Sequence, residues 1–221
     1  MTRATATPAT PAPASRARRP SDTIVADLLD AAAVEFAAHG FAGASTRRIA
    51  QRAGAHQPQI NYHFTSKEQL WRATVDHLFS LMDAALPGPG GTAPLEEAFV
   101  DLLHAFIRFS ADHPELDRII NLEATDRSDR LEWLVATHLR PRFEAVAAGW
   151  RRLRAAGVGA DLSPGEVWEV VTSYGAMHFA NAPMLSLLGI TGGDGRSESD
   201  AHAARVLAVL LPSPAGRGSA P

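Results

Sequence analysis

The sequence predicts an all-α protein in which an N-terminal three-helix group, containing a helix-turn-helix, precedes a larger helical body. Two observations carry this expectation. Apolar residues recur at spacings of three and four along most of the chain, the period of a helix with one buried face. Ser, Gly and Pro separate these periodic segments at the positions where helices begin and end. Together they predict about nine helices.

Length and composition bound the class of protein. The chain has 221 residues, of which 46% are hydrophobic and 20% charged, so it can bury a sizeable core and has an ordinary globular balance. It contains no cysteine, which excludes disulfides and thiolate metal or redox chemistry. The N-terminal residues lack the apolar core of a secretory signal, and no run reaches about 18 apolar residues. We therefore expect a cytoplasmic protein that does not enter a membrane.

The N-terminal segment, residues 1–20, is rich in Ala, Thr and Pro and ends in a basic group of Arg16, Arg18 and Arg19. This composition predicts a disordered tail. Its arginines are either simply solvated or form an arm that reaches DNA phosphates or a minor groove. The first helix then begins at Ser21 and ends near residue 39, where Gly40 stops it.

Residues 45–67 have the pattern of two short helices joined by a tight turn. Ser45 is placed to cap the first of them, and Gly54 tolerates the positive φ that the turn requires. In the second short helix Ile60 and Phe64 lie four residues apart and face inward. The remaining positions of that helix carry hydrogen-bonding groups, namely Gln57, Gln59, Asn61, Tyr62 and His63. A polar second helix after a short turn with glycine is typical of a helix-turn-helix.

A fourth helix begins at Ser66, which forms a capping box with Gln69, and continues to about Leu86. Lys67 lies in its first turn, where the helix dipole disfavours a cation. A DNA phosphate near Lys67 would relieve this conflict. A linker follows at residues 87–91. Basic side chains outnumber acidic ones in residues 16–72 and the reverse holds in 73–221, which favours a polyanion-binding N-terminal part.

The body, residues 92–211, is expected to be helical throughout. Pro141 lies inside a long periodic segment and should kink or break it near Arg140. Ser163, Pro164 and Glu166 combine an N-cap, a first-turn proline and a capping-box glutamate, which predicts a helix start. The other expected boundaries are a stop before His113, a polar loop at 125–129, a turn at 157–159, an interruption at 181–183, a loop at 190–195 and a last helix over about 199–211.

Residues 22–72 resemble the DNA-binding head of the tetracycline-repressor (TetR) family of bacterial regulators. The resemblance departs from the common pattern at Ala44, where Thr is frequent, at His56, where a small hydroxyl residue is usual, and at Asn61, where Tyr is frequent. The missing hydroxyl at His56 removes one group that would contact a phosphate. The matching residues are Leu28 to Ala32, Phe36, Gly40, Phe41, Ser45, Ile49, Ala50, Ala53 to Ala55, Ile60, Tyr62 to Phe64 and Ser66 to Leu70.

Side-chain chemistry and this resemblance indicate similar DNA contacts. Amide side chains pair with base edges, a first-turn proline can meet a thymine methyl, and an arginine can reach a guanine. Hydroxyl and cationic groups near helix ends are better placed for phosphates, which set register. For Tyr62 and His63 the alternative is that they only pack the end of the short helix. The expected base contacts are Arg47, Gln57, Pro58, Gln59 and Asn61, and the expected phosphate contacts are Thr46, Tyr62, His63 and Lys67.

For the body, the resemblance implies a ligand pocket and a homodimer that forms through the last two long helices. The expected ligand-binding residues are aromatic or polar groups within apolar stretches: Asn121, Glu123, Trp133, His138, Trp150, Trp168, Tyr174 and His178. The expected interface residues are apolar or small: Val170, Val171, Tyr174, Ala203, Ala204, Leu207 and Leu211. Two copies held about one DNA turn apart would read an operator-sized site.

Three classes of function are compared. The first is a ligand-responsive regulator, usually a repressor, that binds a palindromic DNA operator as a dimer and is released by a small molecule. The second is a metal sensor that uses some of His104, His113, His138, His178 and Glu166, although they lack the helical spacing of a metal site. The third is a helical enzyme, for which the sequence contains no catalytic motif. We expect the first, with no catalytic residue, metal or cofactor.

The expected domain organisation has four parts. Residues 1–20 form a disordered N-terminal tail and residues 21–66 a helix-turn-helix DNA-binding domain. Residues 67–211 form a helical effector-binding and dimerisation domain, and residues 212–221 a disordered C-terminal tail.

Overall fold

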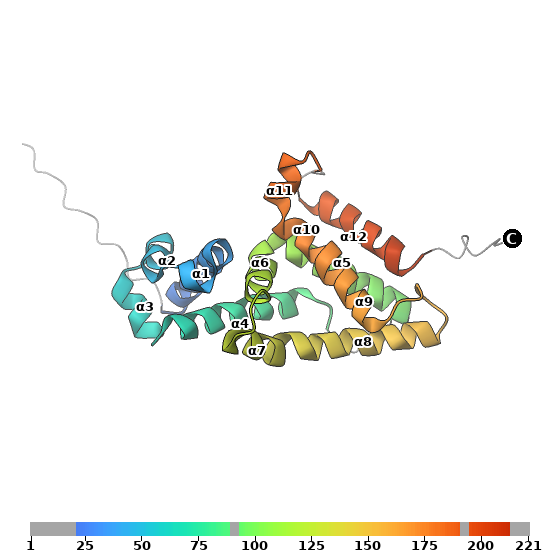
Figure 1. Ribbon diagram of the computed structural model, residues 1–221, viewed down its shortest axis with the longest axis horizontal. Coiled ribbons are helices and arrows are strands. Elements are labelled where there is room, and N and C mark those ends of the chain that lie inside the picture. Colours follow the sequence, from blue (N-terminus) through green and yellow to red (C-terminus); the bar gives the residue numbers. More distant parts are fainter. Residues whose placement is uncertain (1–20, 89–92, 191–194, 213–221) are drawn as a thin grey trace, which may run out of the picture.

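The computed structural model describes residues 21–88, 93–190 and 195–212, and this part of the chain is helical with no strand. The two tails and parts of the linker 87–91 and the loop 190–195 lie outside the described residues, as do the arginines at 16, 18 and 19. Figure 1 shows three N-terminal helices gathered at one end of the molecule, with α4 leading from them into the body. The all-α prediction is confirmed.

The N-terminal group consists of α1 (Ser21–Gly43), α2 (Thr46–Arg52) and α3 (Gln57–His63), followed by α4 (Lys67–Ala85). Gly40 interrupts the helical geometry of α1 with φ 64 and ψ 176, so the first helix turns where the sequence predicted its end. Ser45 and Ser66 cap α2 and α4 by accepting hydrogen bonds from the backbone N–H groups of Arg48 and Gln69.

The body contains the remaining helices, several of which join end to end. Ser163 and Glu166 form the expected capping box at the start of α9. The helix is interrupted at Asn181, after α10, as predicted, and a further short helix, α11, follows. The helices are α5 (Leu95–Asp112), α6 (Pro114–Glu123), α7 (Asp129–Leu134), η1 (Val135–Leu139), α8 (Arg140–Ala155), α9 (Pro164–Glu169), η2 (Val170–Ala176), α10 (Met177–Ala180), α11 (Ala182–Leu187) and α12 (Arg196–Leu210).

The chain continues through Pro141 as a helix and does not break there. It widens into the π-helical segment η1 just before the proline, where the Arg140 N–H donates to the carbonyl of Val135, five residues back. A proline ring clashes with the carbonyl four residues earlier, and it has no N–H to donate. A π turn adds one residue to the turn and moves that carbonyl aside, so α7, η1 and α8 form one long helix.

Two hydrophobic cores stabilise the fold. One contains α1 to α4 and extends into the body through Leu116, Ile119 and Leu134. The other joins α5, α8, α9 and α12 around Trp150 and Val206. The N-terminal helices and α6 therefore share a continuous core, with α6 packed on α1.

Candidate nucleic-acid interface

The candidate reading surface, which holds most of the residues predicted to contact DNA bases, is the outer face of α3. Gln57, Pro58, Asn61 and Tyr62 are exposed, and Tyr62 keeps 84% of its surface accessible. Ile60 of the same helix is 2% exposed and anchors the opposite face in the core. A helix with one buried apolar face and one exposed polar face can enter a DNA groove without unfolding.

A tight turn fixes α3 against α2. Gly54 has φ 64, a conformation that side chains disfavour, and the Ala55 N–H donates to the Ala50 carbonyl at 2.9 Å. The Gln57 Nε2 donates to the Thr46 Oγ1 at 3.0 Å, which ties the start of α3 to the start of α2. These bonds place the N-terminal ends of both helices beside one another.

Arg47 is exposed and is the second residue of α2, next to Thr46, whose hydroxyl accepts from Gln57 at the start of α3. Gln59 is different, because its Oε1 accepts from the His56 backbone N–H at 2.7 Å. Its oxygen therefore caps α3, and only its amide nitrogen remains for another partner.

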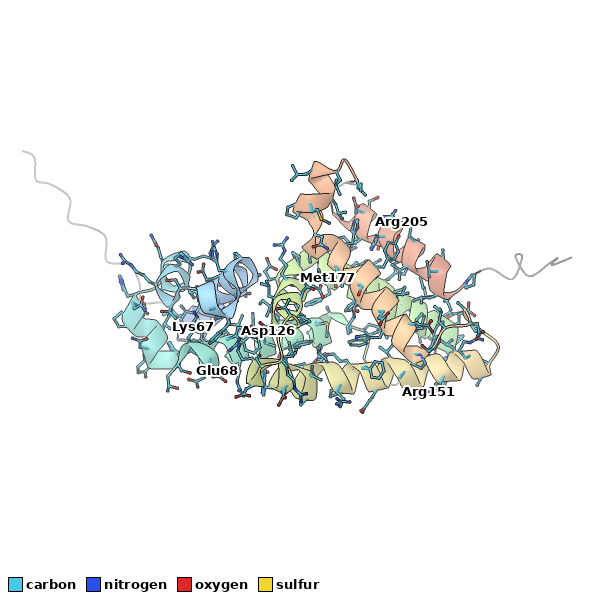
Figure 2. All side chains as sticks on the ribbon, viewed as in Figure 1. Lys67, Glu68, Asp126, Arg151, Met177 and Arg205 are labelled. Atoms are coloured by element: carbon cyan, nitrogen blue, oxygen red, sulfur yellow. The ribbon has the colours of Figure 1, made fainter. Side chains whose placement is uncertain are left out.

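Lys67 already has a partner within the chain. Its Nζ donates to the Ala42 carbonyl at 3.1 Å and lies 5.0 Å from the centre of the Phe41 ring. Figure 2 shows Lys67 at the end of α4 that meets the N-terminal helices. The unfavourable position of this cation in the first turn is thus offset by a carbonyl at the end of α1 as well as by any external anion.

A buried carboxylate, Glu35, positions α2, a role that the sequence did not predict. It is 3% exposed, and its Oε1 accepts from the Arg48 Nε at 2.7 Å and from the Ser45 N–H at 2.9 Å. Burial raises the pKa of this carboxyl, but the hydrogen bonds from Arg48 and Ser45 outweigh it and hold the pKa below its ordinary value. Glu35 and Arg48 therefore fix the angle between α1 and α2.

The body contains an apolar cavity of about 200 Å³ between α4, α5, α8 and η2. Trp168, one of the expected ligand-binding residues, lines it. Val171, which was expected at the dimer interface, lines it as well. The other lining residues are Met82, Leu86, Phe99, Leu102, Leu103, Phe106, Arg142, Ala145, Val146 and Thr172.

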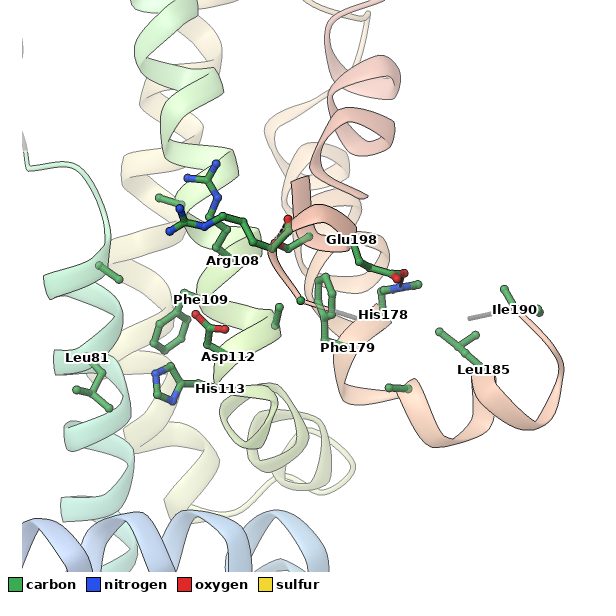
Figure 3. A pocket seen from close by; sticks show the side chains of 17 residues that line it. Leu81, Arg108, Phe109, Asp112, His113, His178, Phe179, Leu185, Ile190 and Glu198 are labelled. Atoms are coloured by element: carbon green, nitrogen blue, oxygen red, sulfur yellow. Dashed lines mark hydrogen bonds and ion pairs between the residues drawn. The ribbon is translucent and has the colours of Figure 1, made fainter. Parts of the chain in front are cut away.

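A larger cleft of about 570 Å³ lies between α4, α5 and the segment from α10 to α12. Figure 3 shows Arg108, Asp112 and His113 on one side of it and His178 with Glu198 on the other. Its walls mix charged and apolar groups, in contrast to those of the apolar cavity.

Comparison with known proteins identifies the class of this architecture. Residues 28–74 match the model of the family described as bacterial regulatory proteins, tetR family. This N-terminal segment carries the tetR family pattern. The match covers α2 and α3 completely, together with much of α1 and the start of α4, so the reading surface lies inside it.

Two curated relatives and one solved structure illustrate the similarity. The chain is 31% identical over 110 residues to the HTH-type transcriptional repressor SCO4008 of Streptomyces coelicolor, covering 50% of this chain and 54% of the relative. It is 24% identical over 115 residues to the probable HTH-type transcriptional regulator YttP of Bacillus subtilis, covering 51% and 56%. The chain thus spans about half the length of the curated relatives it matches.

The solved structure is that of AibR in complex with isovaleryl coenzyme A and operator DNA. It superposes with a TM-score of 0.69 at 16% identity and covers 86% of this chain and 98% of that one. At this identity the similarity extends to the fold alone, and it includes the body as well as the TetR head.

Several residues that the sequence suggested for the TetR ligand pocket have other partners. Glu123 pairs with Arg130 at 3.1 Å, and the Arg130 guanidinium lies 3.9 Å from the centre of the Phe41 ring in the head. His138 bonds to Asp76 at 2.8 Å. Burial lowers the pKa of His138 despite the opposing effect of Asp76.

The other expected ligand residues are scattered. Trp150 is buried and donates from its indole N–H to the Leu162 carbonyl, and Trp133 packs against Trp71. Asn121 is exposed. None of these three lines the apolar cavity or the larger cleft. Of the eight expected ligand-binding residues, Trp168 lines the apolar cavity and His178 lines the larger cleft, and the other six line neither.

The expected interface residues also divide. Tyr174 is 45% exposed and Ala204 is exposed, so both are accessible on the outer side of η2 and α12. Ala203 is fully buried within its own chain, and Val171 lines the apolar cavity. The remaining residues, Val170, Leu207 and Leu211, are half-buried against the second core.

The five candidate metal ligands do not converge. Glu166 caps α9, His138 bonds to Asp76, and His178 lies 3.4 Å from Glu198. Among the described residues no group of three or more His, Cys, Asp or Glu side chains could hold a metal ion. Within the same residues, no helix combines the length and apolar character needed to cross a bilayer.

Proposed function

We propose that this protein is a transcriptional repressor that binds a palindromic DNA operator as a homodimer and is released by a small-molecule effector. The observation that carries the proposal is the exposed polar face of α3 within the segment that matches the tetR family model. In this proposal residues 21–66 form the DNA-binding domain and residues 67–211 the effector-binding and dimerisation domain. The protein acts in the cytoplasm, where its DNA target lies.

The reading surface divides by chemistry. Gln57 and Asn61 present amides, Pro58 presents an apolar edge, and Arg47 presents a guanidinium, all of which suit base edges in the major groove. Gln59 contributes only its amide nitrogen, because its oxygen caps α3. The groups proposed for phosphates surround this set: Thr46, Tyr62, His63 and Lys67.

Dimerisation is proposed through the outer side of α9, η2, α10 and α12. Two exposed residues support this. Ala204 is a small residue on α12 and lets a helix of the second copy approach closely. The aromatic side chain of Tyr174 can bury apolar surface against that copy. A single recognition helix reads only a few base pairs, so two copies are needed to specify an operator.

Effector control is proposed through α4. This helix starts at Lys67, which bonds to the Ala42 carbonyl of the head, and its other end supplies Met82 to the apolar cavity. The structure of AibR in complex with isovaleryl coenzyme A and operator DNA supports a fold that can hold both kinds of ligand. A tilt of α4 on effector binding would move α3 relative to the second copy.

A gel-shift selection with fragments of the source genome tests the proposal. The protein is expected to retain a few fragments against excess competitor DNA and to release them with a member of an organic small-molecule panel but not with metal salts. The double variant Arg47→Ala, Gln57→Ala should remain folded by circular dichroism, despite the loss of the bond from Gln57 to Thr46, and retain none of them. Binding of all fragments alike would reject the regulator proposal, and release by a metal salt alone would favour the metal sensor.

A further inference from the structure

The apolar cavity is almost purely carbon-lined. Phe99, Phe106 and Trp168 supply aromatic walls, and Leu102 and Val146 supply aliphatic ones. Its exposed lining surface contains almost no nitrogen or oxygen. A site of this kind gains affinity from excluding water from apolar surface and offers no solvation to a charge.

Three lining residues carry a side-chain nitrogen or oxygen: Thr172, Arg142 and Trp168, the last as an indole N–H donor. The polar atoms of Thr172 and Arg142 are largely engaged. The Thr172 hydroxyl donates to the Trp168 carbonyl at 2.8 Å. Arg142 donates from Nη2 to both oxygens of Asp83 at 2.6 and 2.7 Å and from Nη1 to the His138 carbonyl. Among the described residues that line this cavity, only Arg142 has a buried side-chain nitrogen or oxygen without a hydrogen-bond partner, its Nε.

This arrangement limits the charge of an occupant. The guanidinium charge of Arg142 is already compensated by Asp83, so a ligand carboxylate would have to displace Asp83 or remain unpaired. A ligand cation would face no carboxylate in the lining. The free Nε–H can still donate one hydrogen bond, which a neutral oxygen acceptor would satisfy.

The size of the cavity limits the occupant as well. An apolar protein cavity of about 150 Å³ is large enough to bind benzene. At about 200 Å³, this cavity fits a molecule somewhat larger than benzene, such as a substituted benzene ring or a short branched chain. A molecule as large as a nucleotide cofactor does not fit inside it.

Resting on the function proposed above, we propose that the effector is a compact, uncharged, mainly hydrocarbon molecule with at most one neutral oxygen acceptor. It binds among Phe99, Phe106 and Trp168, with the oxygen directed at the Arg142 Nε. There it contacts Met82 of α4, the helix that leads to the N-terminal helices, and also Val171 of η2, which belongs to the proposed dimer surface. Binding can therefore change the position of both parts.

Four compounds with eight carbons and one phenyl ring provide a matched test: ethylbenzene, acetophenone, phenylacetate and 2-phenylethylammonium. Binding to the full-length protein is measured by calorimetry and by the rise in melting temperature, which follows ligand occupancy. The two neutral compounds are expected to bind, with acetophenone about two- to tenfold tighter because of its carbonyl acceptor. The two ions are expected to bind at least about tenfold more weakly than either.

A pair of identical substitutions locates the site. Leu102→Trp fills the cavity and should abolish binding of the neutral compounds, whereas Leu122→Trp changes an exposed side chain of α6 that is 43% accessible and should leave binding unchanged. Circular dichroism of both variants verifies folding. If Leu102→Trp does not fold, Val146→Phe takes its place.

Three outcomes would overturn the proposal: none of the four compounds binds, an ion binds as tightly as acetophenone, or binding survives in the filled variant. Tight binding of an ion that survives filling would place the effector in the larger, charged cleft instead. Operator binding of the same protein is measured separately by fluorescence anisotropy. If the protein binds DNA but not the neutral compounds, only this inference is refuted. If it binds the compounds but no DNA, the function on which the inference rests is refuted.

Discussion

Three of the side chains proposed to contact DNA already have partners in the free protein. Gln57 donates to Thr46, Gln59 accepts from His56, and Lys67 donates to Ala42. These bonds hold the side chains in defined rotamers, which lowers the entropy lost when they meet DNA. Arg47 and Asn61 are exposed, so their side chains lose conformational entropy when they bind DNA.

Replacing Arg47 and Lys67 separately should distinguish base reading from phosphate binding. Arg47→Ala is expected to lower the ratio of operator to non-operator affinity by about tenfold, because a guanine contact contributes about 1–3 kcal/mol of discrimination. Lys67→Ala is expected to weaken both affinities alike and to reduce the slope of log affinity against log salt by about one. Anisotropy titrations at several salt concentrations measure both effects. A change of sequence preference in Lys67→Ala, with an unchanged slope, would remove Lys67 from the phosphate contacts.

The Glu35–Arg48 pair makes a prediction about acid stability. The folded pKa of Glu35 lies below its ordinary value of 4.5, so its contribution to stability is complete above about pH 4.5 and is lost as pH falls through the folded pKa. Arg48→Ala should cost about 1–3 kcal/mol at pH 7, because the buried carboxylate loses charged donors. Urea unfolding between pH 3 and 7 measures both. Glu35→Gln should be less stable than wild type at pH 7 and less sensitive to acid; an equal acid dependence would show that Glu35 does not contribute.

At the residue scale, the sequence was informative where the signal is local. Ser45 and Gly54 were predicted because a cap and a positive-φ turn depend on neighbouring residues. Glu35 was not, because its partner Arg48 lies 13 residues away and its burial depends on how α1 packs on α2. Its only sequence signal was a carboxylate on an otherwise apolar face of the first helix.

At the scale of elements, the helix starts and stops were largely predictable and the π segments were not. Serine caps and glycine turns act within a few residues, so the sequence shows them directly. The segments η1 and η2 depend instead on packing. In η2, His202 of α12 donates from Nε2 to the carbonyls of Tyr174 and Gly175 at 3.0 and 3.1 Å, a contact across 27 residues or more. No periodicity in the sequence reveals such a bond.

The turn between α8 and α9 offers a matched pair of glycine substitutions. Gly157 and Gly159 both have positive φ, but a Cβ at Gly159 would lie 2.6 Å from the buried ring of Trp150, whereas one at Gly157 meets nothing within 4 Å. Gly157→Ala should cost about 1–2 kcal/mol from backbone strain alone. Gly159→Ala should cost about 1–3 kcal/mol more, because the Trp150 ring must move. Thermal unfolding measures both, and equal losses would contradict the packing described here.

For the whole molecule, the sequence predicted the all-α architecture and the short polar helix that the structure shows as α3. It did not predict that α6 joins the core of the N-terminal helices, or which inward residues would line a cavity. Phe99, Leu102 and Phe106 follow one another at spacings of three and four, the pattern of one buried helix face. Whether such residues pack tightly or leave space depends on the distances between neighbouring helices. That information is not local in the chain.

The proposed dimer makes a prediction about assembly. Ala204→Glu introduces a charge on the outer side of α12 and is expected to shift the protein from dimer to monomer and to weaken operator binding at least about tenfold, since one head then binds alone. Ala148→Glu makes the same change on an exposed position of α8 and should leave the dimer intact. Light scattering with size-exclusion chromatography measures the mass. A wild-type monomer at micromolar concentration, or a dimeric Ala204→Glu protein with full affinity, would contradict the proposed interface.

Selection of binding sites from random double-stranded DNA tests the central claim most directly. The proposal predicts enrichment of an inverted repeat whose half-sites are spaced by about one turn of DNA or a multiple of it, because two copies of α3 read it together. The same selection with Gln57→Ala should return a repeat with relaxed preference at the same position in both half-sites. Enrichment of no sequence, or of a single motif without symmetry, would contradict a dimeric operator-binding regulator.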